Sequence, residues 1–318
     1  MKRAIFFNMF RNGDLFVVRE FVRSMILQMP QYDWYYAHGN HPDSLSDLPC
    51  TYIPMPHFHE VCASVGCTSH EISELLPVYK PLMANETIRQ LSMESNLYIN
   101  TWAGCWHGHV FPTGTYPNMK DLMVMWNLLG DLVYKKTKDV VNFPLQPLDY
   151  FPIVDKKLCD TQKVNEAVEM LSGYKKIVLV ANGNALSGQS KLHSHHLNNV
   201  IIEMSEHYPE VAFVLTQKIS CNISNIFFTD NFFAKKFDLI DISAFSQFCD
   251  IIVGKNSGPF TYAHTQQNVL DANKTFVSFS NLSRDNLLHD IQDAKCTFIH
   301  SSTESHDEVF GILRDIIK

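Results

Sequence analysis

A turn between a predicted strand and a predicted helix carries the residues best suited to chemistry in this sequence. Residues 249–265 read CDIIVGKNSGPFTYAHT, in which a short apolar run ends at a Gly-Lys-Asn-Ser-Gly-Pro turn. The first N–H groups of a helix lack partners within the helix, and the helix dipole adds partial positive charge, so the turn suits an anion such as a phosphate. Gly258 would let the backbone approach a ligand, and Pro259 fits the first helical turn. An ordinary turn that packs and binds nothing fits the same residues.

The elements that must position this turn alternate between strand and helix along the chain. In the first half we expect strands at 4–9, 32–37, 51–54 and 97–101, and helices at 15–29, within 69–93 and at 119–134. In the second half we expect strands at 176–181, 211–216, 225–228, 250–253, 275–280 and 296–299, and helices at 160–172, 193–207, 243–248, 259–266, 283–292 and 304–317. This alternation predicts an α/β fold with doubly wound, Rossmann-like parallel sheets.

A proline-punctuated segment, residues 143–155, reads FPLQPLDYFPIVD and is expected to link two domains. The 318 residues are enough for two domains of ordinary size. We therefore expect an N-terminal domain at 1–150 and a C-terminal domain at 151–318, facing a central cleft. Ligands of open α/β sheets bind outside the carboxyl ends of the strands, so the cleft is the expected site.

The composition argues against several classes of protein. The formal net charge is −7, and Lys and Arg are scattered, so a nucleic-acid-binding surface is not expected. No window reaches the roughly 18 apolar residues of a membrane-spanning helix, and the N-terminus resembles a signal peptide only weakly. The 8 cysteines form no CxxC pair, which is usual for reduced thiols. We expect a cytoplasmic protein, and a peripheral association with a membrane stays open.

Histidines gather in several short groups, which raises the question of a metal site. The groups are His38 with His41, His57 with His59, His107 with His109, and His193 with His195 and His196. A His-x-His pair on a loop can chelate a metal, but no set of carboxylates or cysteines here has zinc-site spacing. We therefore expect no metal ion.

Two short patches resemble the heptosyltransferase-like glycosyltransferases, which have the two-domain GT-B fold. The first is Asn12-Gly13-Asp14, which opens a predicted helix after the first strand, where the family carries Gly-Asp. The second is residues 248–259, FCDIIVGKNSGP, where the family shows an apolar strand and then Gly-x-Asp-Ser/Thr-Gly-Pro. Residues 238–246, DLIDISAFS, also resemble the segment that precedes this motif.

The sequence departs from the family at two positions of the second patch. Asn256 stands where the family has Asp, and Thr261 stands where it has His, two residues past the proline. His264 is near enough in sequence to compensate, although its helical phase differs. These changes leave the donor sugar, and the activity itself, open.

The resemblance implies roles for particular residues. Asp14 is the expected general base that takes the proton of an acceptor hydroxyl; a helix cap is the alternative for an aspartate at a helix start. The expected donor contacts are Asn182, Gly183, Ser187, Lys191, Asn256, Ser257, Gly258, Pro259 and Thr261, with Lys191 facing a phosphate. The expected acceptor contacts are Asn12, Gly13, Trp102, Trp106, His107 and His109, the last four from a loop that could equally just pack.

The function implied by the resemblance is transfer of a sugar from a nucleotide-sugar donor to a hydroxyl of a glycan or a lipid-linked saccharide. Such an enzyme would invert the anomeric carbon and would need neither a metal nor a further cofactor. Two alternatives remain on the same fold. One is a nucleotide-sugar epimerase or hydrolase, to which the His-rich loops could contribute, and the other is a decayed transferase that binds a nucleotide-sugar without catalysis.

Overall fold

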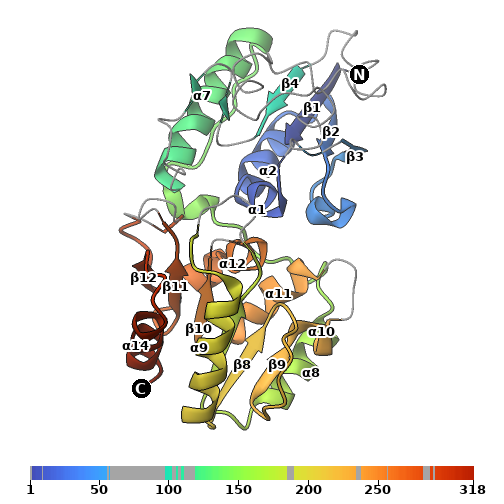
Figure 1. Cartoon of the computed structure of the whole chain (residues 1–318). Helices are drawn as coiled ribbons and strands as arrows, with labels where there is room; N and C mark the ends of the chain where they lie inside the picture. The colour runs from blue at the N-terminus through green and yellow to red at the C-terminus, as the bar shows by residue number, and fades with distance from the viewer. Residues whose placement is uncertain are drawn as a thin grey trace, which may run out of the picture. The chain divides into compact units, whose positions relative to one another are not determined.

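The computed structural model describes residues 2–8, 10–55, 57, 97–101, 105–106, 109–110, 119–184, 190–233, 238–255, 257–281, 287–288 and 291–318. The helices expected within 69–93 lie outside these residues, as does most of the helix expected at 283–292. The chain divides into two units (Figure 1). One comprises the described parts of Met1–Thr113 and Lys120–Tyr150, and the other the described parts of Gly114–Met119 and Phe151–Lys318.

The first unit is built on a parallel sheet with the strand order β3-β2-β1-β4. The strands are β1 (Lys2–Asn8), β2 (Tyr32–His38), β3 (Thr51–Pro54) and β4 (Leu97–Asn100). The central strand β1 is apolar and buried from Ala4 to Phe7, as expected for a parallel strand covered on both faces. A short antiparallel pair, β5 (Cys105–Trp106) and β6 (His109–Val110), lies apart from this sheet.

The helix expected at 15–29 is two helices, α1 (Asn12–Val17) and α2 (Arg19–Gln28), which meet at Val18. Every residue from Leu15 to Val18 is buried, and four consecutive positions cannot share one face of a straight helix. The break therefore turns the second helix so that Phe21 and Val22 also reach the core. The unit is completed by two 3-10 turns, η1 (Pro42–Leu45) and η2 (Pro147–Tyr150), and by α7 (Met119–Thr137).

Several side chains anchor the segment expected to be a linker, residues 143–155, while others such as Leu145 are exposed. The ring of Phe143 stacks on Phe21 with 5.1 Å between centroids, and Tyr150 and Phe151 are both fully buried. The Tyr150 hydroxyl also donates a hydrogen bond to the Pro144 carbonyl at 3.0 Å. The chain passes from one unit to the other through side chains that belong to cores.

The second unit is built on a six-stranded parallel sheet with the order β12-β11-β10-β7-β8-β9. The strands are β7 (Lys176–Ala181), β8 (Val211–Leu215), β9 (Ile226–Phe228), β10 (Ile251–Gly254), β11 (Thr275–Phe279) and β12 (Thr297–Ser301). Numbered within the unit, this is the order 3-2-1-4-5-6 of the Rossmann fold. The first unit shows the first four positions of the same order, 3-2-1-4.

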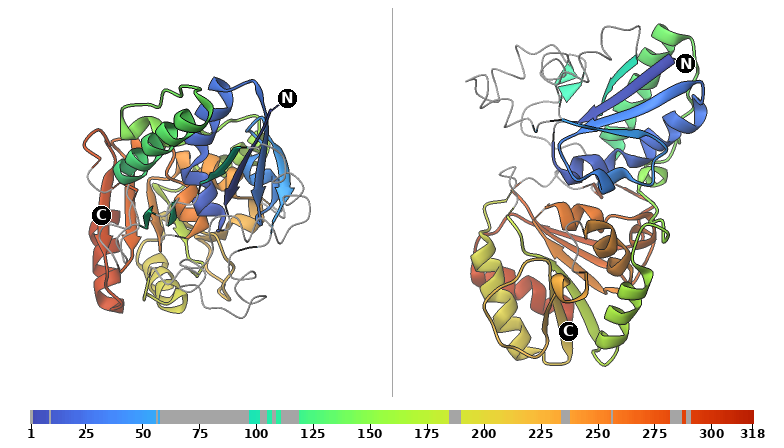
Figure 2. Two further views of the ribbon diagram at one scale, coloured as in Figure 1. Left: turned by 90° about the horizontal axis from the view of Figure 1, so that it is seen from above. Right: turned by 90° about the vertical axis from the view of Figure 1, so that its right-hand side faces the viewer.

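Helices cover both faces of the second sheet (Figure 2). They are α8 (Thr161–Leu171), α9 (Ser194–His207), α10 (Thr229–Phe232), α11 (Leu239–Phe245), α12 (Gly258–Tyr262), α13 (Gln266–Val269) and α14 (His306–Ile317), with the 3-10 turn η3 (Ser246–Phe248). Figure 2 shows α9 and α14 on one face and α8 on the other. Residues of α9 and α14 join alternate residues of the strands in one apolar cluster.

Two helices of this unit differ from expectation. The helix expected at 243–248 begins earlier, at Leu239, and ends in a 3-10 turn. The helix expected at 259–266 is two short helices, because the Thr265 side chain accepts a hydrogen bond from the Asn268 N–H at 3.3 Å and so caps a new helix. Within the described residues, no helix is both long enough and apolar enough to cross a membrane.

Candidate functional site

The carboxyl edge of the second sheet gathers several of the residues that the sequence singled out. Strands β7 and β10 are neighbours, and Ala181 pairs with Gly254 at their ends. From β7 the chain continues to β8 on one side, whereas β10 continues to β11 on the other. This is the point where the strand order reverses, and ligands of open α/β sheets bind outside it. Asn182 and Lys255 follow the two strands directly.

Asn182 holds the edge together. Its side chain is 1% exposed and donates to the Asn198 Oδ1 and to the Gln217 carbonyl, both at 3.0 Å. Its own Oδ1 accepts from the Gln217 N–H at 2.8 Å. At Gly183 a Cβ atom would lie 2.8 Å from the Gln217 Nε2, so the glycine allows this close packing. Both residues position the loop after β7, and contact with a donor stays a prediction for them.

Ser257 has the features expected of a ligand-contacting residue. It is the N-cap of α12, yet its side chain caps nothing. It is 8% exposed, and its buried Oγ has no hydrogen-bond partner among the residues that the structure describes. Buried hydroxyls without partners are uncommon, since the desolvation cost is then uncompensated. A ligand oxygen would supply the missing partner.

Gly258 and Pro259 follow at the start of α12. The nearest side-chain atom to a Cβ placed on Gly258 would be the Leu239 Cδ1 at 3.9 Å, an ordinary contact. Packing within the protein therefore does not demand glycine there, and the close approach of a ligand stays the expected reason. Thr261 is half-buried, and its N–H donates to the Ser257 carbonyl at 2.9 Å. Asn256 and Ser187 lie outside the described residues.

Lys255 is the residue that the sequence interpretation missed. It is 2% exposed, and its Nζ donates to the Ser194 Oγ at 2.6 Å. Burial lowers the pKa of its ammonium. The signal in the sequence was a lysine directly after an apolar strand, at the unspecified position of the Gly-x-Asp pattern. The turn was recognised, but its cation was not.

Lys191, the lysine expected to face a phosphate, is solvent-exposed. Its backbone N–H donates to the Asn281 Oδ1 at 2.9 Å. Because Asn281 follows β11, the loop that carries Lys191 runs along the carboxyl edge of the sheet. A phosphate contact by its side chain stays a prediction.

His264 does not take the place of the missing family histidine. Its ring is buried and stacks on Phe276 with 4.6 Å between centroids, and its Nδ1–H donates to the Phe260 carbonyl at 2.9 Å. Burial lowers the pKa of His264 to about 4, so the imidazole is neutral. It belongs to the core under α12.

The carboxyl edge of the first sheet is also polar, and several of its groups bond to one another, although the buried His38 Nδ1 has no partner among the described residues. At the ends of β1 and β4, the Asn8 Nδ2 donates to the Thr101 Oγ1 at 3.4 Å, and the Tyr36 hydroxyl lies 2.5 Å from the same oxygen. The loop after β1 is tied to the loop after β2, since the Asn40 Nδ2 donates to the Phe10 carbonyl at 2.8 Å. The edge is thereby fixed from three strands.

Asp14 is the third residue of α1 and is half-buried. Its Oδ2 accepts a hydrogen bond from the Arg11 N–H at 3.3 Å, so the carboxylate does cap its own helix. A carboxylate has further acceptor positions, and a role as general base stays a prediction. Asn12 is half-buried and its Oδ1 accepts from the Ser44 hydroxyl at 3.2 Å; Gly13 follows it in the first turn of α1.

The expected aromatic and histidine contacts to an acceptor are largely out of view. Trp102 and His107 lie outside the described residues. Trp106 and His109 pair through the backbones of β5 and β6, but their side chains lie outside the description. Among the residues that the structure describes, no three His, Cys, Asp or Glu side chains come together as a metal site would require.

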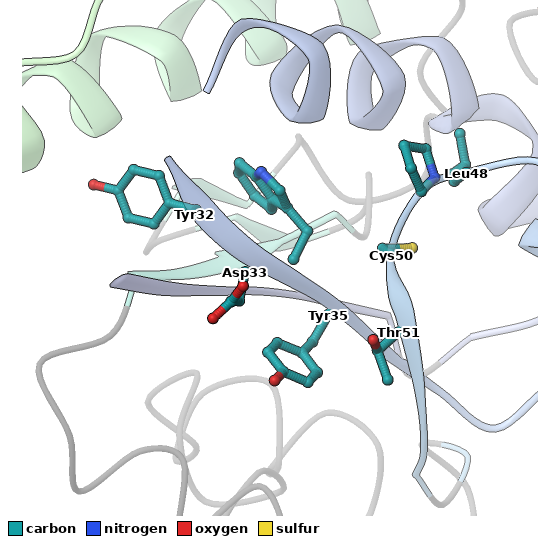
Figure 3. A pocket seen from close by; sticks show the side chains of 8 residues that line it. Tyr32, Asp33, Tyr35, Leu48, Cys50 and Thr51 are labelled. Carbon is teal, nitrogen blue, oxygen red and sulfur yellow. The ribbon is translucent and has the colours of Figure 1, made fainter. Parts of the chain in front are cut away.

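A hollow of about 470 Å³ lies elsewhere in the first unit (Figure 3). It is lined by Tyr32–Tyr35 of β2 and by Leu48–Thr51. Because β3 joins β2 only from Tyr35 onward, the hollow lies at the amino half of the strands, away from the carboxyl edge. Burial raises the pKa of the Cys50 thiol in its wall to about 12, so the thiol is protonated at neutral pH.

Solved structures show which fold this is. The chain aligns with E. coli ADP-heptose lps heptosyltransferase II at a TM-score of 0.57 and 14% identity, over 100% of this chain and 98% of that one. It aligns with E. coli heptosyltransferase WaaC, bound to ADP-2-deoxy-2-fluoro heptose, at a TM-score of 0.51 and 7% identity, over 98% and 99%. With S. aureus MnaA, bound to UDP, the TM-score is 0.50 and the identity 11%, over 100% and 88%.

No family model and no curated protein matches the sequence. The structural likeness is nonetheless over the whole length of the chain, and it confirms the α/β fold with Rossmann-like domains that the sequence predicted. The resemblance to the heptosyltransferases holds at the level of the fold.

Proposed function

We propose that this protein is a glycosyltransferase that moves a sugar from a nucleotide-sugar to a hydroxyl of a glycan or a lipid-linked saccharide. The observation that carries the proposal is the carboxyl edge of β7 and β10. There a buried lysine, Lys255, and an unpartnered buried hydroxyl, that of Ser257, follow the same strand. A buried ammonium and a buried hydroxyl are costly unless they are paired, so they favour an anionic ligand that accepts hydrogen bonds. Both lie at the switch point of a Rossmann sheet, where ligands bind.

The donor class follows from the chemistry of that edge together with the fold. Two solved structures of this fold contain a nucleoside diphosphate or its sugar derivative, namely UDP in MnaA and ADP-2-deoxy-2-fluoro heptose in WaaC. A diphosphate brings the negative charge that Lys255 would balance and the acceptor oxygens that the Ser257 hydroxyl would engage. Asn182, Gly183, Gly258 and Thr261 would shape the surrounding loops.

The reaction is a displacement at the anomeric carbon. The acceptor oxygen forms a bond to that carbon while the bond to the diphosphate oxygen breaks, and the configuration inverts. Asp14 takes the proton of the acceptor hydroxyl. The electron pair of the broken bond leaves with the nucleoside diphosphate. Backbone N–H groups near Ser257 and the ammonium of Lys255 stabilise the charge of this leaving group. No metal and no further cofactor takes part in this proposal.

The acceptor and the place of action are the least specified parts of the proposal. A saccharide or glycolipid would be presented by the loops of the first unit, near Asn12 and Gly13. We propose action in the cytoplasm, at a membrane surface if the acceptor is a lipid.

The test begins with a thermal-shift panel of UDP, ADP and their sugars, because a ligand that binds only the folded state raises the melting temperature. Transfer is then measured with the stabilising donor, with and without saccharide acceptors. Sugar transfer supports the proposal. Conversion of the sugar without an acceptor indicates an epimerase or hydrolase, binding without turnover indicates a decayed transferase, and a panel without any stabilising nucleotide overturns the proposal.

A further inference from the structure

The buried cation at the switch point is unusual because of what surrounds it. Lys255 is 2% exposed, and among the described residues no carboxylate lies within ion-pair distance of its ammonium. Its one partner there is the neutral hydroxyl of Ser194, at 2.6 Å. An ammonium carries three N–H donors, so two of them have no protein partner in the described structure. Burial of a charge in this state is costly unless something compensates it.

The Ser194 hydroxyl bonds to two neighbouring side chains. It donates to the Asn184 Oδ1 at 2.7 Å and accepts from the Lys255 Nζ. These three side chains run inward from the surface, since Asn184 is exposed, Ser194 is half-buried and Lys255 is buried. They form a polar chain from solvent to the cation.

The middle residue of this polar chain, Ser194, is the first residue of α9, a helix of 14 residues. The N-cap residue, His193, makes no side-chain hydrogen bond to the first turn. Ser194 is the first residue of the helix, so its hydroxyl lies in the turn that carries the unpaired N–H groups and the positive end of the helix dipole. Ser257, whose buried Oγ has no partner, lies two residues after Lys255.

We infer that Lys255, and not the loop lysine Lys191, supplies the positive charge for the diphosphate of the donor. This inference rests on the proposed function. An anionic oxygen takes the place of Asn184 at Ser194 and the first turn of α9, and Lys255 lies beneath as its counter-charge. Lys255 is thus a positioning residue that acts through Ser194. Lys191, which is exposed, steers the ligand at most by long-range attraction.

The comparison of two matched variants tests the inference. Lys255→Met keeps an unbranched side chain and removes the charge, and Lys191→Met makes the same change on the exposed loop. UDP and ADP are titrated by calorimetry into each protein at several pH values between about 7 and 10, in buffers of different ionisation enthalpy. We expect Lys255→Met to weaken the binding of the preferred diphosphate by about tenfold or more, and Lys191→Met by less than about threefold.

Proton uptake gives a readout that a merely structural role would not move. A buried ammonium without a counter-charge loses its proton more easily, and a bound anion restores the charged form. Binding to the native protein should therefore take up a fraction of a proton at alkaline pH, and Lys255→Met should abolish this uptake. The melting temperature of the free Lys255→Met protein should be unchanged or raised, because an uncompensated charge has been removed.

The outcomes separate the two proposals. If the native protein binds a diphosphate and Lys255→Met binds it equally well, the inference is overturned while the proposed function stands. An equal loss in both lysine variants also overturns the assignment to Lys255. If the native protein binds neither UDP nor ADP, both proposals fall. Should Lys255→Met not fold, Ser194→Ala replaces it: a loss of about threefold or more supports the inference, and native affinity overturns it.

Discussion

The two units place polar side chains at the same edge of the same kind of sheet, yet they treat them differently. In the first unit Asn8, Tyr36 and Thr101 bond to one another, although the buried His38 Nδ1 at the end of β2 has no partner among the described residues. In the second unit a lysine and a serine are buried with bonding capacity left over. A satisfied edge gains stability and rigidity, whereas an unsatisfied one gives up stability that a ligand can restore. The buried cation Lys255 of the second unit supports the proposal that this unit binds the charged ligand.

The first prediction tests whether a loss of stability in the first unit leaves nucleotide binding unchanged. Asp47 is buried in the first unit and pairs with Arg19 and, at 2.6 Å, with Arg23. Asp47→Ala leaves the buried Arg19 without a carboxylate, with only its bond to the Ser44 carbonyl among the described residues, and should lower the free energy of unfolding by about 3–5 kcal/mol. Binding of UDP or ADP should not change.

The measurement can follow the first unit alone. All 4 tryptophans of the chain precede residue 150, so tryptophan fluorescence in a denaturant titration reports that unit. The control is Asp43→Ala, whose side chain is 65% exposed and whose loss should cost less than about 0.5 kcal/mol. A tenfold loss of nucleotide affinity in Asp47→Ala would contradict the separation.

Acid should destabilise both units through one buried histidine in each. Burial lowers the pKa of His38 in the first unit and of His264 in the second to about 4. In the unfolded chain these histidines take up a proton near pH 6.5, whereas in the folded protein they do so only near pH 4. The free energy of unfolding therefore keeps its neutral-pH value above about pH 6.5 and decreases as the pH falls from about 6.5 to about 4. The loss should approach about 3 kcal/mol for each residue.

Fluorescence and circular dichroism, followed in parallel, distinguish the two histidines. His264→Phe should reduce the acid sensitivity seen by circular dichroism and leave the fluorescence transition of the first unit unchanged. His195→Phe, at an exposed position of α9, serves as the control and should alter neither. Acid sensitivity that survives in the His264 variant would show that other groups dominate in the second unit.

Asp14→Asn sharpens the comparison on the side of catalysis. An amide oxygen can still accept from the Arg11 N–H, so the helix cap is kept and stability should change by less than about 1 kcal/mol. Transfer should fall by about 100-fold or more, with the affinity for the donor unchanged. Turnover numbers and donor affinity are measured on the same preparation. A variant with native turnover would show that Asp14 is only a cap.

Two serines of the second unit should respond in opposite ways. Ser257→Ala removes a hydroxyl without a partner, so the free protein should keep its stability while diphosphate affinity falls by about 3- to 10-fold. Ser243→Ala removes a hydroxyl that donates to the Tyr262 carbonyl at 2.6 Å, and it should cost about 1–2 kcal/mol with affinity unchanged. Melting curves and calorimetry check both. Equal behaviour of the two variants would remove the reason to assign Ser257 to a ligand.

The sequence predicted elements well where a single local signal decides them. The strands at 51–54 and 176–181 have the predicted bounds, because each is a short apolar or β-branched run between clear turns. The break at Val18 was missed, since it depends on which residues the core accepts. The break at Thr265 was also missed, although Thr265 followed by Asn268 is a capping pattern that the sequence does show.

The sequence predicted where the candidate site lies, but not which side chains contact one another there. The turn at 255–259 and the loop that begins at Asn182 do lie on neighbouring strands. Which lysine is buried there could not be predicted, because the Ser194 that receives Lys255 lies 61 residues away in sequence. The hydrogen bond from the Gln217 N–H to the Asn182 Oδ1 could not be predicted either, because only the fold brings the two residues together.

The glycine that ends β10 has a consequence for how a ligand would be received. A methyl group on Gly254 would come within 2.5 Å of the Phe260 ring, so the ring lies directly against the backbone. The Thr261 N–H bond to the Ser257 carbonyl fastens the other side of the turn. The backbone that carries Lys255 and Ser257 is therefore held in place before a ligand binds. The conformational entropy of this turn is lost on folding, so a ligand does not have to order it on binding.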